Sequence, residues 1–100
     1  MDVQLKKGVL DLCVLSALLD EDRYGYQLTE KISQQLEVTA GTLYLVLKRL
    51  KDSGYLTTYL VESSSGPARK YYKITEEGRQ FQKKQKQQWL EFVEKVGNLL

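Results

Sequence analysis

The chain has 100 residues, a net charge of +2, one cysteine and no histidine. This length suits one compact domain, and the composition excludes an internal disulfide, the usual Cys/His zinc sites and the catalytic dyads and triads that need histidine. Every apolar stretch is shorter than the ~20 residues of a membrane span, so we expect a cytoplasmic protein that is not an enzyme and holds no metal or cofactor.

Apolar residues at steps of three and four predict a first helix over residues 5–19. They cover more than one narrow stripe of that helix, so we expect the domain core to cover one side and a partner to cover another. Cys13 lies within this segment and has no basic neighbour in the sequence, which favours a buried and unreactive thiol.

Two further helices are predicted in the first half of the chain. The second begins near Tyr24 and runs to about Gln35, and the third covers residues 40–52. Thr39 precedes the third helix and is expected to cap it, because its hydroxyl accepts a hydrogen bond from an early backbone N–H. Gly54 follows that helix and suits the left-handed position at which many helices end.

The period of the apolar residues then changes. Residues 55–61 and 68–74 are rich in β-branched and aromatic side chains, which predicts two strands joined by a loop that contains the only proline. Tyr71 and Tyr72 point to opposite faces of their strand, so we expect one in the core and the other exposed. Thr75 is expected to cap a long last helix.

Positive charge is concentrated in the middle of the chain. Residues 39–74 carry six Lys or Arg and two Asp or Glu, a net charge of +4, whereas the remaining residues carry −2. All seven tyrosines lie between positions 24 and 72. A basic segment interleaved with tyrosines is typical of a surface that meets phosphates, although a solvated charged face has the same composition.

Three helices, a hairpin and a further helix follow one another as in a winged helix-turn-helix, whose third helix enters the major groove of DNA. The predicted fold class is therefore mainly α with a small β-hairpin. We expect a DNA-binding domain at 1–75 and a C-terminal dimerisation helix at 76–100, in one compact unit. The candidate DNA-binding residues are Tyr26, Thr39, Thr42, Tyr44, Lys48, Arg69 and Lys70. The alternative is a winged helix that binds another protein and no DNA.

Several short motifs have a characteristic spacing. They lie at residues 25–28 (GYQL), 41–44 (GTLY), 47–50 (LKRL), 54–56 (GYL) and 66–78 (GPARKYYKITEEG). Together they resemble the PadR family of bacterial transcriptional regulators, and the last helix with Trp89 resembles that of the short subfamily, in which this helix forms the dimer. The resemblance implies a homodimeric DNA-binding repressor that a small aromatic effector releases. Leu45 replaces a proline common in the family, and the serines at 63–65 leave the wing tip without basic residues.

Surplus apolar surface on the first and last helices predicts a twofold dimer. Its operator in double-stranded DNA would be an inverted repeat with half-site centres about 34–36 Å apart. The expected dimer residues are Leu5, Val9, Trp89, Phe92, Val93, Val96 and Leu99. Trp89, Phe92 and Val96 share one helix face, so paired copies would hold a planar aromatic effector by stacking. The alternative is that Trp89 only fills the dimer core.

Overall fold

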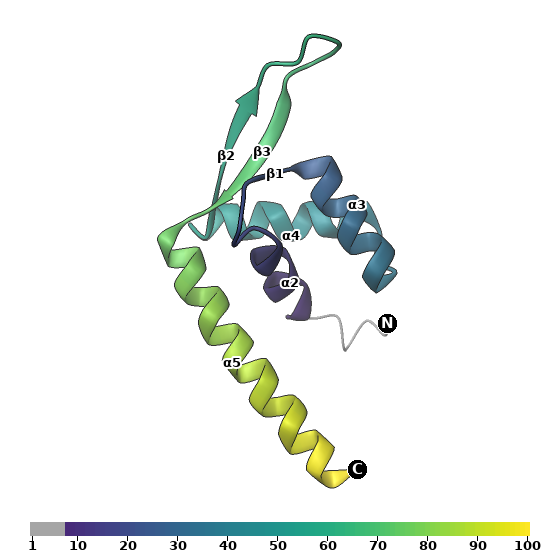
Figure 1. The fold of residues 1–100 in the computed structure, drawn as a ribbon, viewed down its shortest axis with the longest axis vertical. Helices are drawn as coiled ribbons and strands as arrows, with labels where there is room; N and C mark the ends of the chain where they lie inside the picture. The colour runs from purple at the N-terminus through teal and green to yellow at the C-terminus, as the bar shows by residue number, and fades with distance from the viewer. Residues whose placement is uncertain (1–7) are drawn as a thin grey trace.

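The structure, a computed structural model, describes residues 8–100 and confirms the predicted fold class (Figure 1). Its elements in chain order are α2 (Val9–Ala17), β1 (Arg23–Tyr24), α3 (Gly25–Leu36), α4 (Ala40–Asp52), β2 (Leu56–Val61), β3 (Arg69–Ile74) and α5 (Glu76–Leu99). The strands form one antiparallel sheet in the order β1-β3-β2. The β2–β3 hairpin projects from the helices as the wing of a winged helix (Figure 1).

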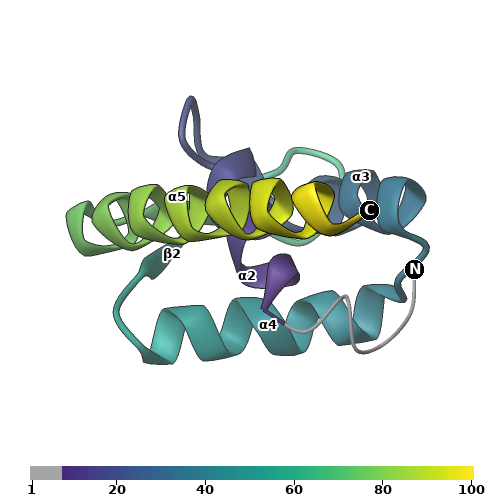
Figure 2. The same ribbon diagram turned by 90° about the horizontal axis from the view of Figure 1, so that it is seen from below.

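The hydrophobic core lies where α2, α3 and α4 meet one face of the sheet. Its fully buried apolar side chains are Val14, Leu15, Leu18, Leu28, Leu43, Leu47, Leu50 and Leu56. The leucines of α4 recur at steps of three and four, so this helix buries one face and leaves the opposite face exposed. Figure 2 shows α2 between α4 and α5, and it contacts both of them.

The predicted helix ends are confirmed by their local hydrogen bonds. Thr39 Oγ1 accepts from the backbone N–H of Thr42 at 3.2 Å, and Thr75 Oγ1 accepts from that of Gly78 at 3.0 Å. Gly54 has a φ of 84°, as expected for the left-handed residue after a helix. The Thr39 cap and Gly54 fix where α4 begins and ends, and therefore which of its residues face outward. The Thr75 cap fixes the start of α5.

The first helix differs from its prediction over residues 5–19. The start of that range, including Leu5, lies outside the described residues, and α2 itself ends at Ala17. The end has a local cause, because Arg23 Nε donates to the carbonyl oxygen of Ala17 at 2.6 Å and the chain turns toward β1. Cys13 is half-buried rather than fully buried, and this burial raises the pKa of its thiol.

The first turns of α5 pack on the domain. Phe81 stacks on Tyr55 with ring centroids 4.3 Å apart, and Gln82 Nε2 donates to Ser16 Oγ of α2 at 3.1 Å. Gly78 approaches the backbone of Tyr55 so closely that a Cβ would overlap its carbonyl oxygen. The second half of α5 extends away from the domain, and the longest dimension of the chain is 55 Å (Figure 1). Within residues 8–100, no helix is both long and apolar enough to cross a membrane.

Candidate nucleic-acid interface

The exposed face of α4 carries three of the predicted DNA-binding residues. Tyr44 and Lys48 lie one turn apart on this face, and both are exposed. Lys48 Nζ donates to Asp52 Oδ2 at 2.9 Å, which raises the pKa of Lys48 and lowers the pKa of Asp52. Thr42 is also exposed, in the first turn of the helix. A helix that presents hydroxyls and an ammonium group has the donors that phosphate and base edges accept.

Sequence reasoning assigned no role to Leu45, the most exposed large side chain of this face. Leu45 is 70% exposed, and on the helical wheel it lies beside Lys48, on the side away from Tyr44. Gly41, one turn earlier, would meet no atom within 4 Å if it carried a Cβ. The face therefore combines polar donors with a bare backbone position and an apolar group, and thymine offers an apolar methyl group in the major groove.

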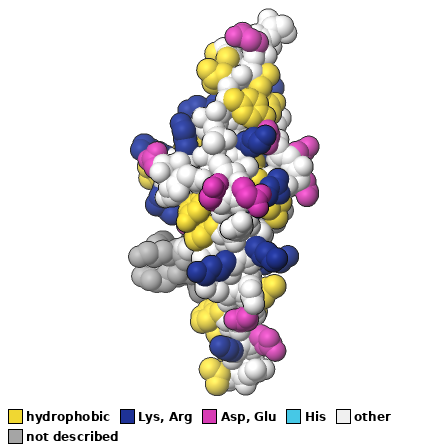
Figure 3. Space-filling model, turned by 90° about the vertical axis from the view of Figure 1, so that its left-hand side faces the viewer, with side chains coloured by type: hydrophobic (Ala, Val, Ile, Leu, Met, Phe, Trp, Pro, Cys, Tyr) yellow, Lys and Arg dark blue, Asp and Glu magenta, His cyan; other side chains and the backbone are white. Residues whose placement is uncertain are grey.

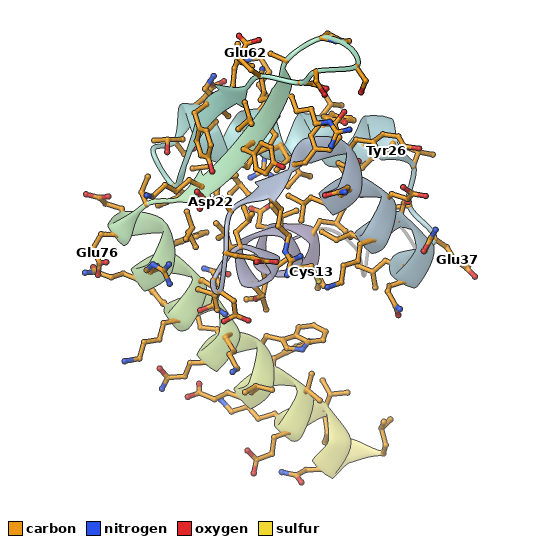
Figure 4. All side chains as sticks on the ribbon, turned by 45° about the horizontal axis from the view of Figure 1, so that its top comes forward. Cys13, Asp22, Tyr26, Glu37, Glu62 and Glu76 are labelled. Atoms are coloured by element: carbon orange, nitrogen blue, oxygen red, sulfur yellow. The ribbon has the colours of Figure 1, made fainter. Side chains whose placement is uncertain are left out.

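Tyr26 and Thr39 lie at the starts of two different helices. Tyr26 is 58% exposed in the first turn of α3 and is labelled in Figure 4. Thr39 caps α4, and its hydroxyl lies 3.0 Å from that of Thr42. Helix N-termini attract anions because their first backbone N–H groups have no partner within the helix. Both residues are thus placed where a phosphate would be favoured.

Arg69 and Lys70 do not converge on one surface, although the sequence analysis grouped them. They are neighbours on β3, and successive side chains of a strand point to opposite faces of the sheet. The guanidinium carbon of Arg69 lies 5.1 Å from the ring centroid of Tyr24, a cation–π contact. Lys70 is exposed and shares the sheet face of Tyr72, which is buried. One cation is therefore held against a ring, and the other extends from the opposite face.

A row of tyrosines crosses the sheet on the face of Arg69. Tyr71 pairs with Tyr24 of β1 and with Tyr59 of β2, and the ring centroids lie 6.0 and 5.7 Å apart. Tyr26 continues the row at 6.2 Å from Tyr24. Tyr59 Oη donates to Asp22 Oδ2 at 2.6 Å, and this bond raises the pKa of Tyr59. Figure 4 shows Asp22 and Tyr26 at the two ends of β1.

This row was not predicted from the sequence, because β1 was not predicted. The confinement of all tyrosines to residues 24–72 was the available signal. The prediction for the tyrosine pair of β3 is confirmed in part, because Tyr72 is buried and Tyr71 is half-buried rather than exposed. Because the rings of the row contact one another across strands, they join the wing to β1.

The apolar half of α5 is not covered by any of residues 8–88. Trp89 is 36% exposed and Phe92 is 59% exposed, with ring centroids 6.5 Å apart. The predicted dimer residues Val93, Val96 and Leu99 are exposed on the same helix. In Figure 3, hydrophobic side chains are exposed at the lower end of the molecule, which α5 forms. Val9, on α2, is half-buried.

A paired charge connects α4 to α2. Arg49 Nη1 donates to Asp11 Oδ2 at 2.8 Å, and Arg49 Nη2 donates to Asp11 Oδ1 at 2.5 Å. Arg49 belongs to the positive segment of residues 39–74, and its position was not predicted from the sequence. Its guanidinium is directed toward α2 in the structure, so it is not free on the exposed face in the way that Tyr44 is.

Comparison with known proteins supplies the family context. The model of the transcriptional regulator PadR-like family matches residues 14–84. An uncharacterized protein of Lysinibacillus sphaericus is 34% identical over 92 residues, which cover 88% of this chain and 84% of that protein. A Streptococcus transcriptional regulator of known structure is 32% identical, with a TM-score of 0.86 and 98% of each chain covered. A PadR-like transcriptional regulator from Bacillus cereus is 37% identical, with a TM-score of 0.84 and coverage of 96% and 95%.

Proposed function

Because this chain belongs to the PadR-like family of transcriptional regulators, we propose that it is a homodimeric repressor that binds an inverted repeat in double-stranded DNA. Regulators of this family bind DNA and are not enzymes. The observation that carries the proposal is the exposed face of α4, where Tyr44, Leu45 and Lys48 stand together on a helix whose other face is locked into the core.

In the proposed complex, α4 lies in the major groove. Tyr44 and Lys48 reach base edges or phosphates from its middle, and Thr39 with Thr42 contacts a phosphate at its start. Lys48 exchanges its contact with Asp52 for one with DNA. Arg69 and Lys70 bind the adjacent backbone from the two faces of the wing, and Tyr26 donates its hydroxyl to a phosphate. These three residues and the two threonines position the protein, whereas Tyr44 and Lys48 read sequence where they reach base edges.

The proposed dimer covers the apolar half of α5 with the same surface of a second copy. Trp89, Phe92, Val93, Val96 and Leu99 form a self-complementary patch in an isologous twofold interface, to which Val9 of α2 adds. Full burial of each such side chain contributes about 1.5–3 kcal/mol. Twofold symmetry places two copies of α4 on successive turns of DNA, which requires an inverted repeat.

The proposed effector is a small planar aromatic compound. Trp89, Phe92 and Val96 of both copies would line its site near the twofold axis, and the indoles would stack on its faces. Binding there changes the separation of the two α4 helices and so releases the DNA. The supporting observation is that Trp89 and Phe92 are exposed side by side on a face that the rest of residues 8–100 leaves uncovered.

The test of DNA binding uses the duplex upstream of the gene that encodes this chain, in gel shifts across a series of salt concentrations. We expect binding that weakens steeply as salt rises. Replacing Lys48, Arg69 and Lys70 together with Ala should weaken binding, by about 1–3 kcal/mol for each residue that makes a bidentate base contact. A folded wild-type protein that does not bind the duplex, or a folded triple variant with unchanged affinity, would contradict the proposal.

A further inference from the structure

The contact between Asp11 and Arg49 joins the proposed recognition helix to its neighbour. Two nearly parallel hydrogen bonds of 2.8 and 2.5 Å connect the guanidinium to both carboxylate oxygens. Such a bidentate pair fixes the relative orientation of its two planar groups as well as their distance. The Asp11 side chain is 16% exposed and the Arg49 side chain is 56% exposed, so solvent reaches the pair from the side of the guanidinium while the carboxylate is largely shielded.

The buried face of α4 consists of Leu43, Val46, Leu47 and Leu50. Apolar burial is non-directional, so it holds a helix against the core more firmly than it fixes rotation about the helix axis. Arg49 follows Lys48 directly and lies one turn after Leu45, at the border of the exposed face. A directional contact at this border determines which way that face points.

We propose that Asp11 is a positioning residue for DNA binding, which holds α4 through Arg49 in the rotation that presents Tyr44, Leu45 and Lys48 to the groove. The inference rests on the proposed DNA-binding function. Asp11 belongs to α2, which lies between α4 and α5 in Figure 2. The orientation of α4 is thereby tied to the helix that also contacts the proposed dimer helix.

Electrostatics alone gives the opposite expectation. Asp11 is a negative charge near a surface that meets a polyanion, so its neutralisation in Asp11→Asn should strengthen DNA binding if charge were its whole effect. Positioning requires that the same substitution weaken binding, because the guanidinium loses its charged bidentate partner. The sign of the change therefore separates the two roles.

Asp52 offers a matched control on α4 itself. Its carboxylate is exposed and bonds to Lys48 one turn earlier in the same helix. Asp52→Asn removes the same charge as Asp11→Asn and releases Lys48, so we expect unchanged or tighter DNA binding. Arg49→Lys is the second informative variant, because it keeps the positive charge and loses the planar fork that binds both carboxylate oxygens.

The experiment measures binding of the full-length variants to the upstream duplex at several salt concentrations. We expect Asp11→Asn and Arg49→Lys each to weaken binding about tenfold, with an unchanged salt slope because no phosphate contact is lost. The double variant should be no weaker than either single variant, because both remove the same contact. Circular dichroism and thermal unfolding show that each variant is folded at the assay temperature.

Three results would overturn the inference. The first is a folded Asp11→Asn variant that binds DNA as well as the wild type or better. The second is losses in the two single variants that simply add in the double variant. The third is a smaller salt slope in Arg49→Gln, which removes the positive charge, together with an unchanged salt slope in Asp11→Asn. This result would make Arg49 a direct phosphate contact. Absence of binding by the wild type would instead refute the proposed function, and the inference with it.

Discussion

Gly25 and Gly41 both stand near the start of a helix, but their surroundings differ. A Cβ on Gly25 would lie 2.8 Å from Cε2 of Tyr72. The packing of α3 against β3 therefore requires a residue without a side chain at this position. A Cβ on Gly41 would meet no atom of residues 8–100 within 4 Å, so packing among these residues does not require glycine there. Gly41 lies one turn before Leu45 on the exposed face of α4. Its bare backbone lets a ligand approach that helix closely.

Gly41→Ala should therefore affect stability and DNA binding in opposite directions. We expect the free energy of unfolding to rise by up to about 1 kcal/mol, because alanine loses less conformational freedom in a helix. DNA affinity should fall, because the added methyl group holds the groove away from α4. Thermal unfolding and gel shifts on the same samples measure both. A stabilised variant with full DNA affinity would exclude close approach at Gly41.

Two buried or half-buried groups make stability sensitive to alkaline pH. Burial raises the pKa of the Cys13 thiol above its ordinary value of 9.0 and that of the Tyr72 phenol above 10.0. The unfolded chain releases these protons first, so the folded state binds more protons and loses stability as pH rises. We expect the urea concentration at the midpoint of unfolding to fall as the pH is raised from about 9 to about 11. Tyr72→Phe should flatten this decline, and an identical decline in that variant would show that Tyr72 does not contribute.

Residues whose partners are close in sequence were predictable, and those with distant partners were not. Thr39 and Thr75 bond to groups three residues later, so short-range capping rules place them correctly. Asp11 and Arg49 are 38 residues apart, and Ser16 and Gln82 are 66 residues apart. Only the packing of the helices brings these pairs together, and a single sequence carries no signal of that packing.

The same limit acts on whole elements. The bounds of α4 agree with the prediction because a cap, an apolar ridge and a terminal glycine all mark them. The strand β1 has two residues, too few to show the alternation by which a strand is recognised. Its pairing with β3 positions Tyr24 beside Tyr71, so the tyrosine row and the placement of Arg69 on a ring became visible only in the structure.

The junction between α5 and the domain depends on the absence of a side chain at Gly78. A Cβ there would overlap the carbonyl oxygen of Tyr55 and lie 2.8 Å from Cγ1 of Ile74. We expect Gly78→Ala to lower the free energy of unfolding by about 1–3 kcal/mol, measured by urea denaturation. Gly41→Ala serves as the control, since a Cβ fits there. Equal stability of the two variants would mean that α5 adjusts without cost.

At the scale of the whole molecule, the proposed dimer predicts the effect of a charge on α5. Phe92→Glu should give a chain with the mass of a monomer in light scattering, with retained helix content and lost operator binding, because a carboxylate would be buried in the interface. Gln87→Glu adds the same charge on the side of α5 away from Trp89 and should leave the dimer intact. A dimeric Phe92→Glu variant would place the interface elsewhere.

The proposed effector site predicts a response of the only tryptophan. Planar aromatic compounds, including phenolic acids and cationic dyes, should quench Trp89 fluorescence saturably and weaken operator binding over the same concentration range. Trp89→Ala should still form a dimer and lose both responses, with ligand binding then followed by the compound's own absorbance. If this variant binds the same compound equally well and still releases DNA, stacking on the indole has no part in recognition.

The exposed apolar half of α5 also bears on the cellular concentration at which the proposed repressor would act. Within residues 8–100, Phe92, Leu99 and their neighbours are exposed to water, and exposed apolar patches attract chaperones and proteases. The proposed dimer would cover them, and mass action would make dimerisation depend on abundance. We would then expect unassembled copies to be degraded faster than dimers. Repression would then increase sharply above a certain expression level. The apolar surface of α5 would determine that level, because it sets the affinity of the dimer.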